Sequence, residues 1–125
     1  MKLINNNISV GIWSENYERL AKWYEEVLSF KVKQKMTLSN DTFIEFDLGN
    51  NSLFIGQHSE IHGQNKDGLR IMIGFDVESV GDLYNELKDK GVEFIAPPFE
   101  APSGGFWCTT LKDPEGNVLQ FYGTK

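Results

Sequence analysis

The last strand-like segment of the chain, VLQFY (118–122), carries a single amide, Gln120, among apolar side chains. A buried amide without hydrogen-bond partners costs about 1–3 kcal/mol. Gln120 must therefore face either polar groups of the core or a bound molecule, and the sequence supports both interpretations equally. The segment follows DPEGN (113–117), where Pro114 presets a turn and Gly116 can take a positive φ, so residues 113–122 predict the end of a hairpin.

Other side chains capable of chemistry are scattered along the chain. His58 and His62 lie four residues apart and would share one face of a helix, as a metal-binding pair requires. The surrounding GQHSEIHGQ has flanking glycines and no apolar stripe, so we interpret both as solvated loop histidines. Glu45 and Asp47 share one strand face and are expected at a solvated edge rather than in a cavity. Cys108 has no histidine partner in the sequence and is interpreted as an inert core residue.

The elements that position these side chains follow a repeated order. Residues 8–14 alternate, with Ile8, Val10 and Ile12 on one side and Ser9, Gly11 and Trp13 on the other, which predicts a strand with two different faces. Residues 16–28 carry apolar side chains at helical spacing, with Asn16 as the expected N-cap. Further strands are predicted at 30–36, 42–48 and 52–57. The first half is therefore expected to fold as β-α-β-β-β.

The second half repeats this order. A strand at 70–77 precedes a helix that Ser79 caps and Gly91 ends. Strands are then predicted at 92–95, 105–112 and 117–122. At an offset of 63 residues the strand and helix patterns of the two halves coincide, and Gly11 falls on Gly74. We infer an internal duplication of about half the chain.

The sequence therefore predicts one α+β domain. It consists of two tandem βαβββ modules that form an incompletely closed, cavity-lining sheet. Module one covers about residues 1–58, a polar linker covers 59–67, and module two covers about 68–125.

Composition narrows the possible partners. The 125 residues include 12 basic and 18 acidic side chains, for a net charge of −6. Nucleic-acid binding depends on clustered lysine and arginine, so we expect no nucleic-acid partner. No apolar run is long enough to cross a bilayer, so we expect no membrane partner. A single cysteine is compatible with a reducing cytoplasm, where we expect the protein.

Two segments carry a resemblance to a known family. WYEEVLSFKV (23–32) is similar to its helix-to-strand passage, and GGFWCTTLKDPEGNVLQFY (104–122) is similar to its final hairpin. With the tandem βαβββ modules, the chain resembles the vicinal oxygen chelate superfamily, which includes glyoxalase I, extradiol dioxygenases and bleomycin-resistance proteins. The resemblance also implies a homodimer whose partner completes the cavity.

In the metal-dependent members of this superfamily, four side chains from the first and last strands of the modules bind one divalent ion. The matching positions here are Ser9, Met72, a residue at or beside Ile55, and Gln120, where the family commonly has glutamate. A hydroxyl, a thioether, an aliphatic chain and a neutral amide do not form a ligand set for a divalent ion. We therefore predict no metal site and no cofactor.

A cavity between the strands remains in this interpretation. Strand alternation and the resemblance predict an apolar, aromatic pocket with a few polar anchors, which is typical of small-molecule sites. Gly11 and Gly74 leave either room for a ligand or room for close packing of the strands. The candidate ligand-binding residues are Ser9, Trp13, Met72, Asp76, Phe106, Trp107, Gln120 and Tyr122, and for each of them core packing is the alternative.

Three functions follow, in order of preference. The first is a metal-free binding protein of the bleomycin-resistance type, which sequesters an apolar or cationic aromatic compound and so provides antibiotic resistance. The second is a glyoxalase-like lyase, an isomerase or a dioxygenase-related enzyme with an atypical or displaced metal site. Asp76 and Glu45 are then the candidates for acid–base chemistry, and neither has a visible partner in the sequence. The third is a structural or regulatory module whose pocket only packs.

Overall fold

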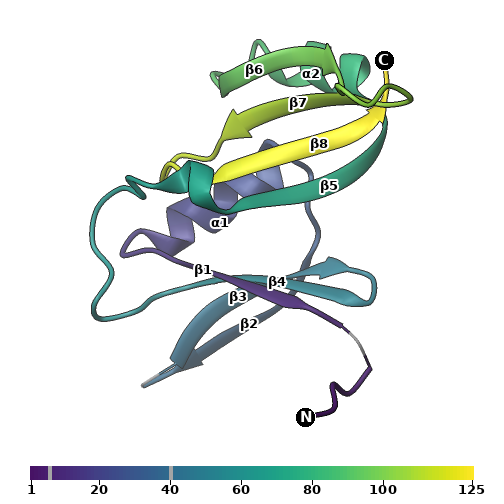
Figure 1. Cartoon of the computed structure of the whole chain (residues 1–125). Helices are drawn as coiled ribbons and strands as arrows, with labels where there is room; N and C mark the ends of the chain where they lie inside the picture. Colours follow the sequence, from purple (N-terminus) through teal and green to yellow (C-terminus); the bar gives the residue numbers. More distant parts are fainter. Residues whose placement is uncertain (6, 40) are drawn as a thin grey trace. The chain divides into compact units, whose positions relative to one another are not determined.

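The computed structural model describes residues 1–5, 7–39 and 41–125. The chain divides into two units, Met1–Gly63 and Gln64–Lys125. Each unit contains one four-stranded sheet and one α-helix (Figure 1). The predicted α+β class and the two tandem βαβββ modules are confirmed, and the eight strands form two separate open sheets.

The first unit has the strand order β1-β4-β3-β2, which we call sheet 1. The first strand runs parallel to β4, whereas β4, β3 and β2 are successively antiparallel. A parallel pair needs a crossover connection, and the helix and the two intervening strands supply it. The elements are β1 (Ser9–Trp13), α1 (Tyr17–Glu26), β2 (Val32–Leu38), β3 (Asp41–Leu48) and β4 (Asn51–Gly56).

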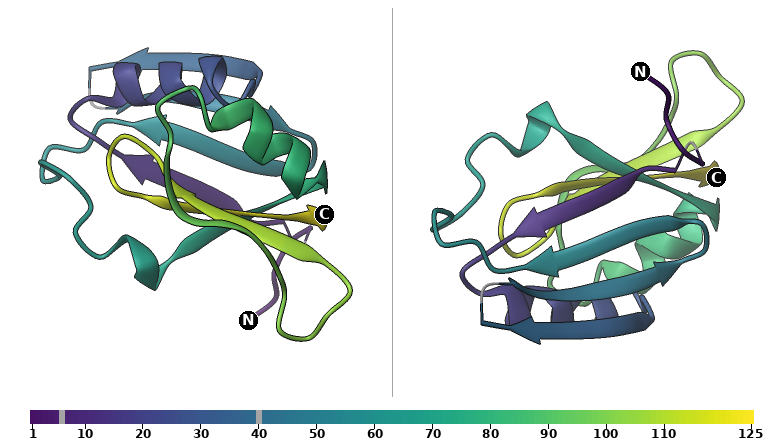
Figure 2. Two further views of the ribbon diagram at one scale, coloured as in Figure 1. Left: turned by 90° about the horizontal axis from the view of Figure 1, so that it is seen from above. Right: turned by 90° about the horizontal axis from the view of Figure 1, so that it is seen from below.

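The second unit repeats this topology with the order β5-β8-β7-β6, which we call sheet 2. A single 3-10 turn, η1, precedes its first strand, and Figure 2 shows the sheet from two further directions. The elements are η1 (Gly68–Arg70), β5 (Met72–Ser79), α2 (Val80–Leu87), β6 (Glu93–Glu100), β7 (Trp107–Lys112) and β8 (Val118–Thr124).

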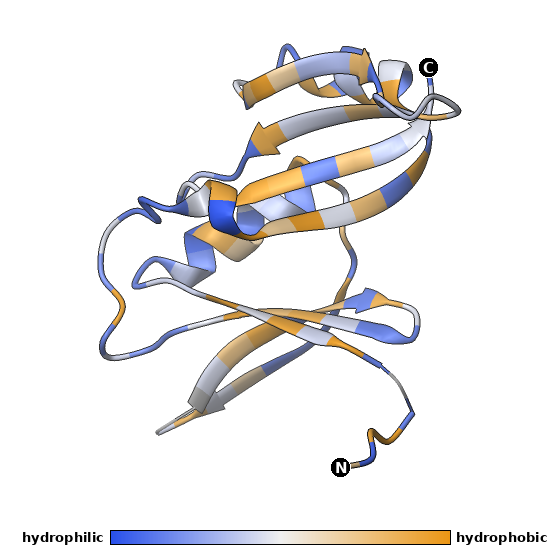
Figure 3. Ribbon diagram, in the orientation of Figure 1, coloured by the Kyte–Doolittle hydropathy of each residue, from blue (hydrophilic) through white to orange (hydrophobic). Residues whose placement is uncertain are grey.

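Each helix covers one face of the sheet in its own unit. In the first unit Tyr24 of α1 packs against Phe46 of β3, with ring centroids 6.1 Å apart. In the second, Tyr84 of α2 contacts Phe94 of β6 at 4.8 Å. Hydropathy alternates along β5 and β8, as the hydropathy colouring in Figure 3 shows, because successive residues face opposite sides of the sheet. We call the face of each sheet that its own helix does not cover the helix-free face.

The two helices begin differently. The Ser79 side chain accepts a hydrogen bond from the backbone N–H of Asp82, as predicted. Asn16 is the N-cap residue of α1, as predicted, and its side chain makes no capping hydrogen bond. The buried Ser14 hydroxyl instead accepts the backbone N–H of Asn16 at 2.9 Å, which organises the entry to the helix.

Strand β6 is longer than the predicted strand at 92–95. Strand β6 extends to Glu100 although it contains Pro97 and Pro98, because it lies at the edge of its sheet, where a missing N–H costs little. Its pairing with β7 is irregular between Ala96 and Phe99. The DPEGN turn is confirmed, since Gly116 has φ of 85° and its N–H bonds to the carbonyl of Asp113.

The predicted linker is irregular throughout, and each of its ends bonds to a different unit. His62 and the N–H of Gly63 bond to the carboxylate of Glu15 at 3.1 and 2.9 Å. The next residues bond to the hairpin turn of the second unit: the N–H of Asn65 reaches the Glu115 carbonyl at 2.7 Å. None of the helices in the described residues has the length and hydropathy needed to span a membrane.

Candidate functional site

Gln120 is half-buried on the helix-free face of sheet 2, and its amide is hydrogen-bonded at both ends. Its Nε2 donates to Oγ1 of Thr110 at 3.1 Å, and its Oε1 accepts from the hydroxyl of Tyr122 at 2.6 Å. Thr110 is the direct cross-strand neighbour of Gln120, and Tyr122 lies two residues along the same strand. These two bonds satisfy the amide within the protein and fix its orientation.

Tyr122 lies over a glycine on the neighbouring strand. A Cβ atom added to Gly74 would lie 2.7 Å from Cε2 of Tyr122, which is closer than real Cβ contacts. Gly11 accommodates the ring of Phe54 in the same way, also at 2.7 Å. The two glycines related by the duplication therefore make room for aromatic rings of the protein itself.

Further predicted site residues gather around Tyr122. The ring of Phe106 makes an edge contact with that of Tyr122, with centroids 6.1 Å apart, and Phe106 is 40% exposed. Asp76 is the cross-strand neighbour of Tyr122, and Met72 lies on the same face of β5. The second unit thus brings five of the predicted residues to one face, namely Met72, Asp76, Phe106, Gln120 and Tyr122.

Trp107 lies apart from this group. Within β7, Cys108 pairs with Tyr122 and Thr110 pairs with Gln120, so strand alternation turns Trp107 to the face that carries α2. There the ammonium of Lys125 lies 5.0 Å from the ring centroid of Trp107. Phe106 and Trp107 are therefore neighbours in the sequence but lie on opposite faces of the sheet. Cys108 is buried, and burial raises the pKa of its thiol, in agreement with an unreactive residue.

The first unit carries an aromatic cluster on the helix-free face of sheet 1. Trp13 contacts Phe54 edge-on at 5.5 Å, and Phe43 contacts Phe54 at 5.6 Å. The ring of His58 lies 5.8 Å from that of Trp13. Ser9 is exposed on the same face, opposite Ser52 of β4. Trp13 and Ser9 are thus on one sheet, with the aromatic contacts at the Trp13 end.

Glu45 belongs to this face and is the residue that sequence reasoning undervalued. It is half-buried, and its two carboxylate oxygens accept hydrogen bonds from Ser52 and Gln34, at 2.5 and 2.6 Å. These two bonds, Ser52 first, lower the pKa of Glu45, and the nearby charge of Lys33 acts in the same direction. The sequence shows a polar residue, Gln34 or Ser52, on each of the two neighbouring strands. Only the strand register shows that both lie next to Glu45.

The register also identifies the first-unit counterpart of Gln120. Gly74 pairs with Gln120, and its duplicate Gly11 pairs with Phe54. The matching position is therefore Phe54. Its neighbour Ile55 is fully buried, on the face of the sheet that α1 covers.

The four family ligand positions thus hold Ser9, Phe54, Met72 and Gln120. A phenyl ring and a thioether offer nothing to a hard divalent ion, and one hydroxyl and one neutral amide are weak ligands. These residues do not fit the metal centre of the family. Among the described residues, no three His, Cys, Asp or Glu side chains are grouped so that they could hold a metal ion.

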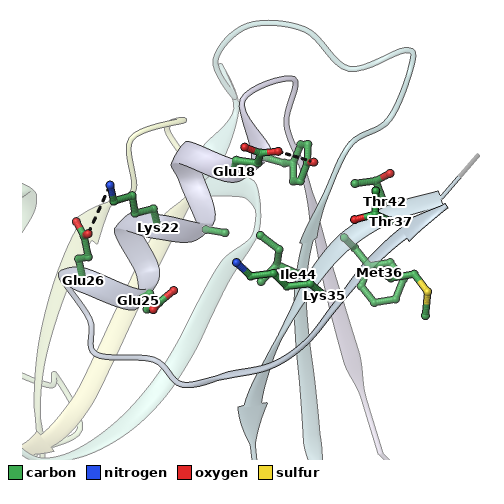
Figure 4. Close-up of a pocket in the computed structure, with 12 residues that line it drawn as sticks. Glu18, Lys22, Glu25, Glu26, Lys35, Met36, Thr37, Thr42 and Ile44 are labelled. Carbon is green, nitrogen blue, oxygen red and sulfur yellow. Dashed lines mark hydrogen bonds and ion pairs between the residues drawn. The ribbon is translucent and has the colours of Figure 1, made fainter. Parts of the chain in front are cut away.

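A pocket of about 470 Å³ lies on the other side of sheet 1, between α1 and the strands β2 and β3 (Figure 4). It lies where α1, which packs mainly over β4 and β3, faces the neighbouring strand β2. Its walls are mainly charged and hydroxyl side chains, among them Glu18, Glu25 and Lys35, over a floor that includes the buried Ile44. None of the eight predicted ligand-binding residues lines it.

Comparison with known proteins gives one family. The profile described as the Glyoxalase/Bleomycin resistance protein/Dioxygenase superfamily matches residues 8–121. No curated protein gives a significant match.

Solved structures share the fold. A glyoxalase family protein from Enterococcus faecalis is 26% identical, with a TM-score of 0.73 over 91% of this chain and 94% of its own. TnmS3, an antibiotic binding protein from Streptomyces sp. CB03234, is 15% identical, with a TM-score of 0.79 over the full length of both chains. TioX from Micromonospora sp. ML1 is also 15% identical, with a TM-score of 0.74 over 97% of this chain and all of its own.

Proposed function

Because the chain belongs to the Glyoxalase/Bleomycin resistance protein/Dioxygenase superfamily, we propose that it is a metal-free protein that binds a small apolar or cationic aromatic compound. The observation that carries this proposal is the hydrogen-bonded row Tyr122–Gln120–Thr110 on the helix-free face of sheet 2. At the position where family enzymes commonly hold a metal with glutamate, this chain has a neutral amide fixed by its neighbours.

The side chains around this row suit recognition of a flat molecule. Phe106 and Tyr122 offer apolar ring surface, and the phenol oxygen of Tyr122 keeps free lone pairs because its hydrogen is directed to Gln120. Preorganised polar groups beside aromatic surface are the usual composition of small-molecule sites. Because both partners of Gln120 are already in place, binding requires no reorganisation of the amide.

The relatives favour sequestration as the role. TnmS3 shares the fold along the whole chain and is described as an antibiotic binding protein. Transferred to this chain, that role is protection of a cell, in its cytoplasm, by removal of a toxic aromatic compound from solution.

A homodimer is part of the proposal. Ile8 and Ile71, which occupy equivalent positions before the edge strands β1 and β5, are 67% and 74% exposed. Exposed apolar side chains beside unpaired strand edges are suited to contact with a second copy. Size-exclusion chromatography with light scattering should give twice the chain mass of 14.2 kDa, and a mass of one chain would contradict the dimer.

The binding test uses two probes of similar shape, neutral quinoline and cationic N-methylquinolinium. Each is titrated at neutral pH into purified protein whose metal content has been measured. We expect at least one of them to bind, in EDTA as well as in buffer, and Tyr122→Phe to weaken that binding about threefold to tenfold. Tyr17→Phe is the matched control, since Tyr17 donates its hydroxyl to the exposed Glu18. Failure of both probes to bind, or a stoichiometric divalent ion in the purified protein, would contradict the proposal.

A further inference from the structure

The helix-free face of sheet 1 combines a held carboxylate with aromatic rings, and nothing in the family resemblance assigns a role to that carboxylate. We infer that this face is a site for an organic cation, whose charged group pairs with Glu45 and whose flat part lies against Trp13 and Phe54. The inference rests on the proposed small-molecule function and adds a binding face on the first unit, with the charge of its ligand and the residue that selects that charge.

The first step is the position of Glu45 within the sheet. Gly11, Phe54, Glu45 and Gln34 are successive cross-strand partners, so they form one row across β1, β4, β3 and β2. Direct cross-strand neighbours on one face have Cβ atoms about 5 Å apart. The carboxylate therefore lies beside the ring of Phe54, and Gly11 lets that ring spread over β1.

The second step is the state of the carboxylate. Ser52 and Gln34 each donate one hydrogen bond to a different oxygen of Glu45, which holds the side chain in one place on the sheet. Each carboxylate oxygen can accept two hydrogen bonds, so both oxygens retain an acceptor position for a ligand. The same two hydrogen bonds lower the pKa of Glu45, so the group is ionised at neutral pH.

The third step is the aromatic surface next to this charge. The row that follows along the strands contains Trp13 and Phe43, both in contact with Phe54. Trp13 is 37% exposed, so part of the indole remains available. A cation over an aromatic face, with a carboxylate nearby, gains from the ring quadrupole and from the opposite charge together. A metal ion would gain little here, because rings are not its ligands.

Two lysines of β2 bear on the charge of this face. Lys33 is a nearby positive charge that lowers the pKa of Glu45, so a bound cation shares the carboxylate with it. Lys35 pairs with Ile44, whose side chain is buried under α1, and Lys35 lines the pocket on that side of the sheet. Strand alternation therefore directs this ammonium away from the helix-free face.

The experiment compares N-methylquinolinium with quinoline by calorimetry and by the indole N–H signals of Trp13, Trp23 and Trp107 in nitrogen-15 spectra. We expect the cation to move the Trp13 signal and to bind Glu45→Gln about fivefold or more weakly than the wild-type chain. Quinoline should bind both proteins equally. Asp47→Asn is the matched control: it removes the same charge two residues away and should stay close to wild type.

Equal binding of the cation to the wild-type chain and Glu45→Gln would overturn the inference. So would an equal loss in Asp47→Asn, or a response of Trp107 in place of Trp13. In each of these cases a compound still binds and the proposed function stands, whereas failure of both probes with the wild-type chain contradicts that function as well.

Two further measurements keep the test decisive if Glu45→Gln fails to fold. Glu45→Asp keeps the charge and should retain stronger binding of the cation than of quinoline. Raising the salt concentration should weaken binding of N-methylquinolinium to the wild-type chain and leave quinoline unchanged. Absence of both effects would contradict a charged site.

Discussion

At the scale of single residues, the hydrogen bond from Tyr122 to Gln120 has a cost that can be measured. Tyr122→Phe leaves Oε1 of a half-buried amide without its donor, which should lower the free energy of unfolding by about 1 kcal/mol. Tyr17→Phe removes an exposed hydroxyl and should change it by less than about half of that. Urea unfolding of the three proteins checks this, and equal stability of wild type and Tyr122→Phe would contradict the assigned orientation of the amide.

The lowered pKa of Glu45 gives a pH dependence with a definite sign. In the unfolded chain this carboxyl titrates near 4.5, and in the folded chain it titrates lower because Ser52 and Gln34 stabilise the charged form. Its contribution to stability is therefore complete above the unfolded pKa and is lost as the pH falls through the lower folded pKa.

The stability difference between the wild-type chain and Glu45→Gln should accordingly be constant from pH 7 to about 5 and shrink below about 4.5. Urea unfolding at a series of pH values measures it. A difference that grows on acidification would show that the pKa is raised instead. The same trend in Asp47→Asn would indicate an effect of net charge.

At the scale of elements, the hairpin turn before β8 depends on Gly116 for two reasons. Its φ of 85° disfavours any side chain, and an added Cβ would lie 2.7 Å from the carbonyl oxygen of Asn65. Gly49, in the turn between β3 and β4, has φ of 69° but no atom within 4 Å of the added Cβ.

Replacing each glycine by alanine separates the two costs. Gly49→Ala should lower the free energy of unfolding by about 1–2 kcal/mol, from backbone strain alone. Gly116→Ala should cost clearly more, because the chain around Asn65 must also move. Thermal or urea unfolding compares them, and equal losses would show that the contact with Asn65 contributes nothing.

The elements themselves were largely predictable from the sequence. Period-two alternation, helical spacing, and the turn residues Pro114 and Gly116 each act locally, so strands, helices and the final hairpin were located to within a few residues. The extension of β6 through Pro97 and Pro98 was missed, because a proline's tolerance depends on whether its strand lies at an edge. That is a property of the sheet and not of the segment.

At the scale of the whole molecule, the duplication was visible in the sequence, but the sites were only partly so. Trp107 is adjacent to Phe106 in the chain yet turns to the other face, since alternation begins from the true start of β7. Glu45 acquires its partners from two other strands, so no spacing in the sequence could reveal them. Local pattern predicts the elements, whereas strand register decides which side chains meet.

The division of hydrogen bonds within residues 58–67 has a consequence for engineering. His62 and Gly63 are tied to Glu15, and Gln64 and Asn65 are tied to the DPEGN turn. Opening the peptide bond between Gly63 and Gln64 would break none of these contacts. That bond is accordingly the natural place for an inserted peptide or for a protease site between the two units.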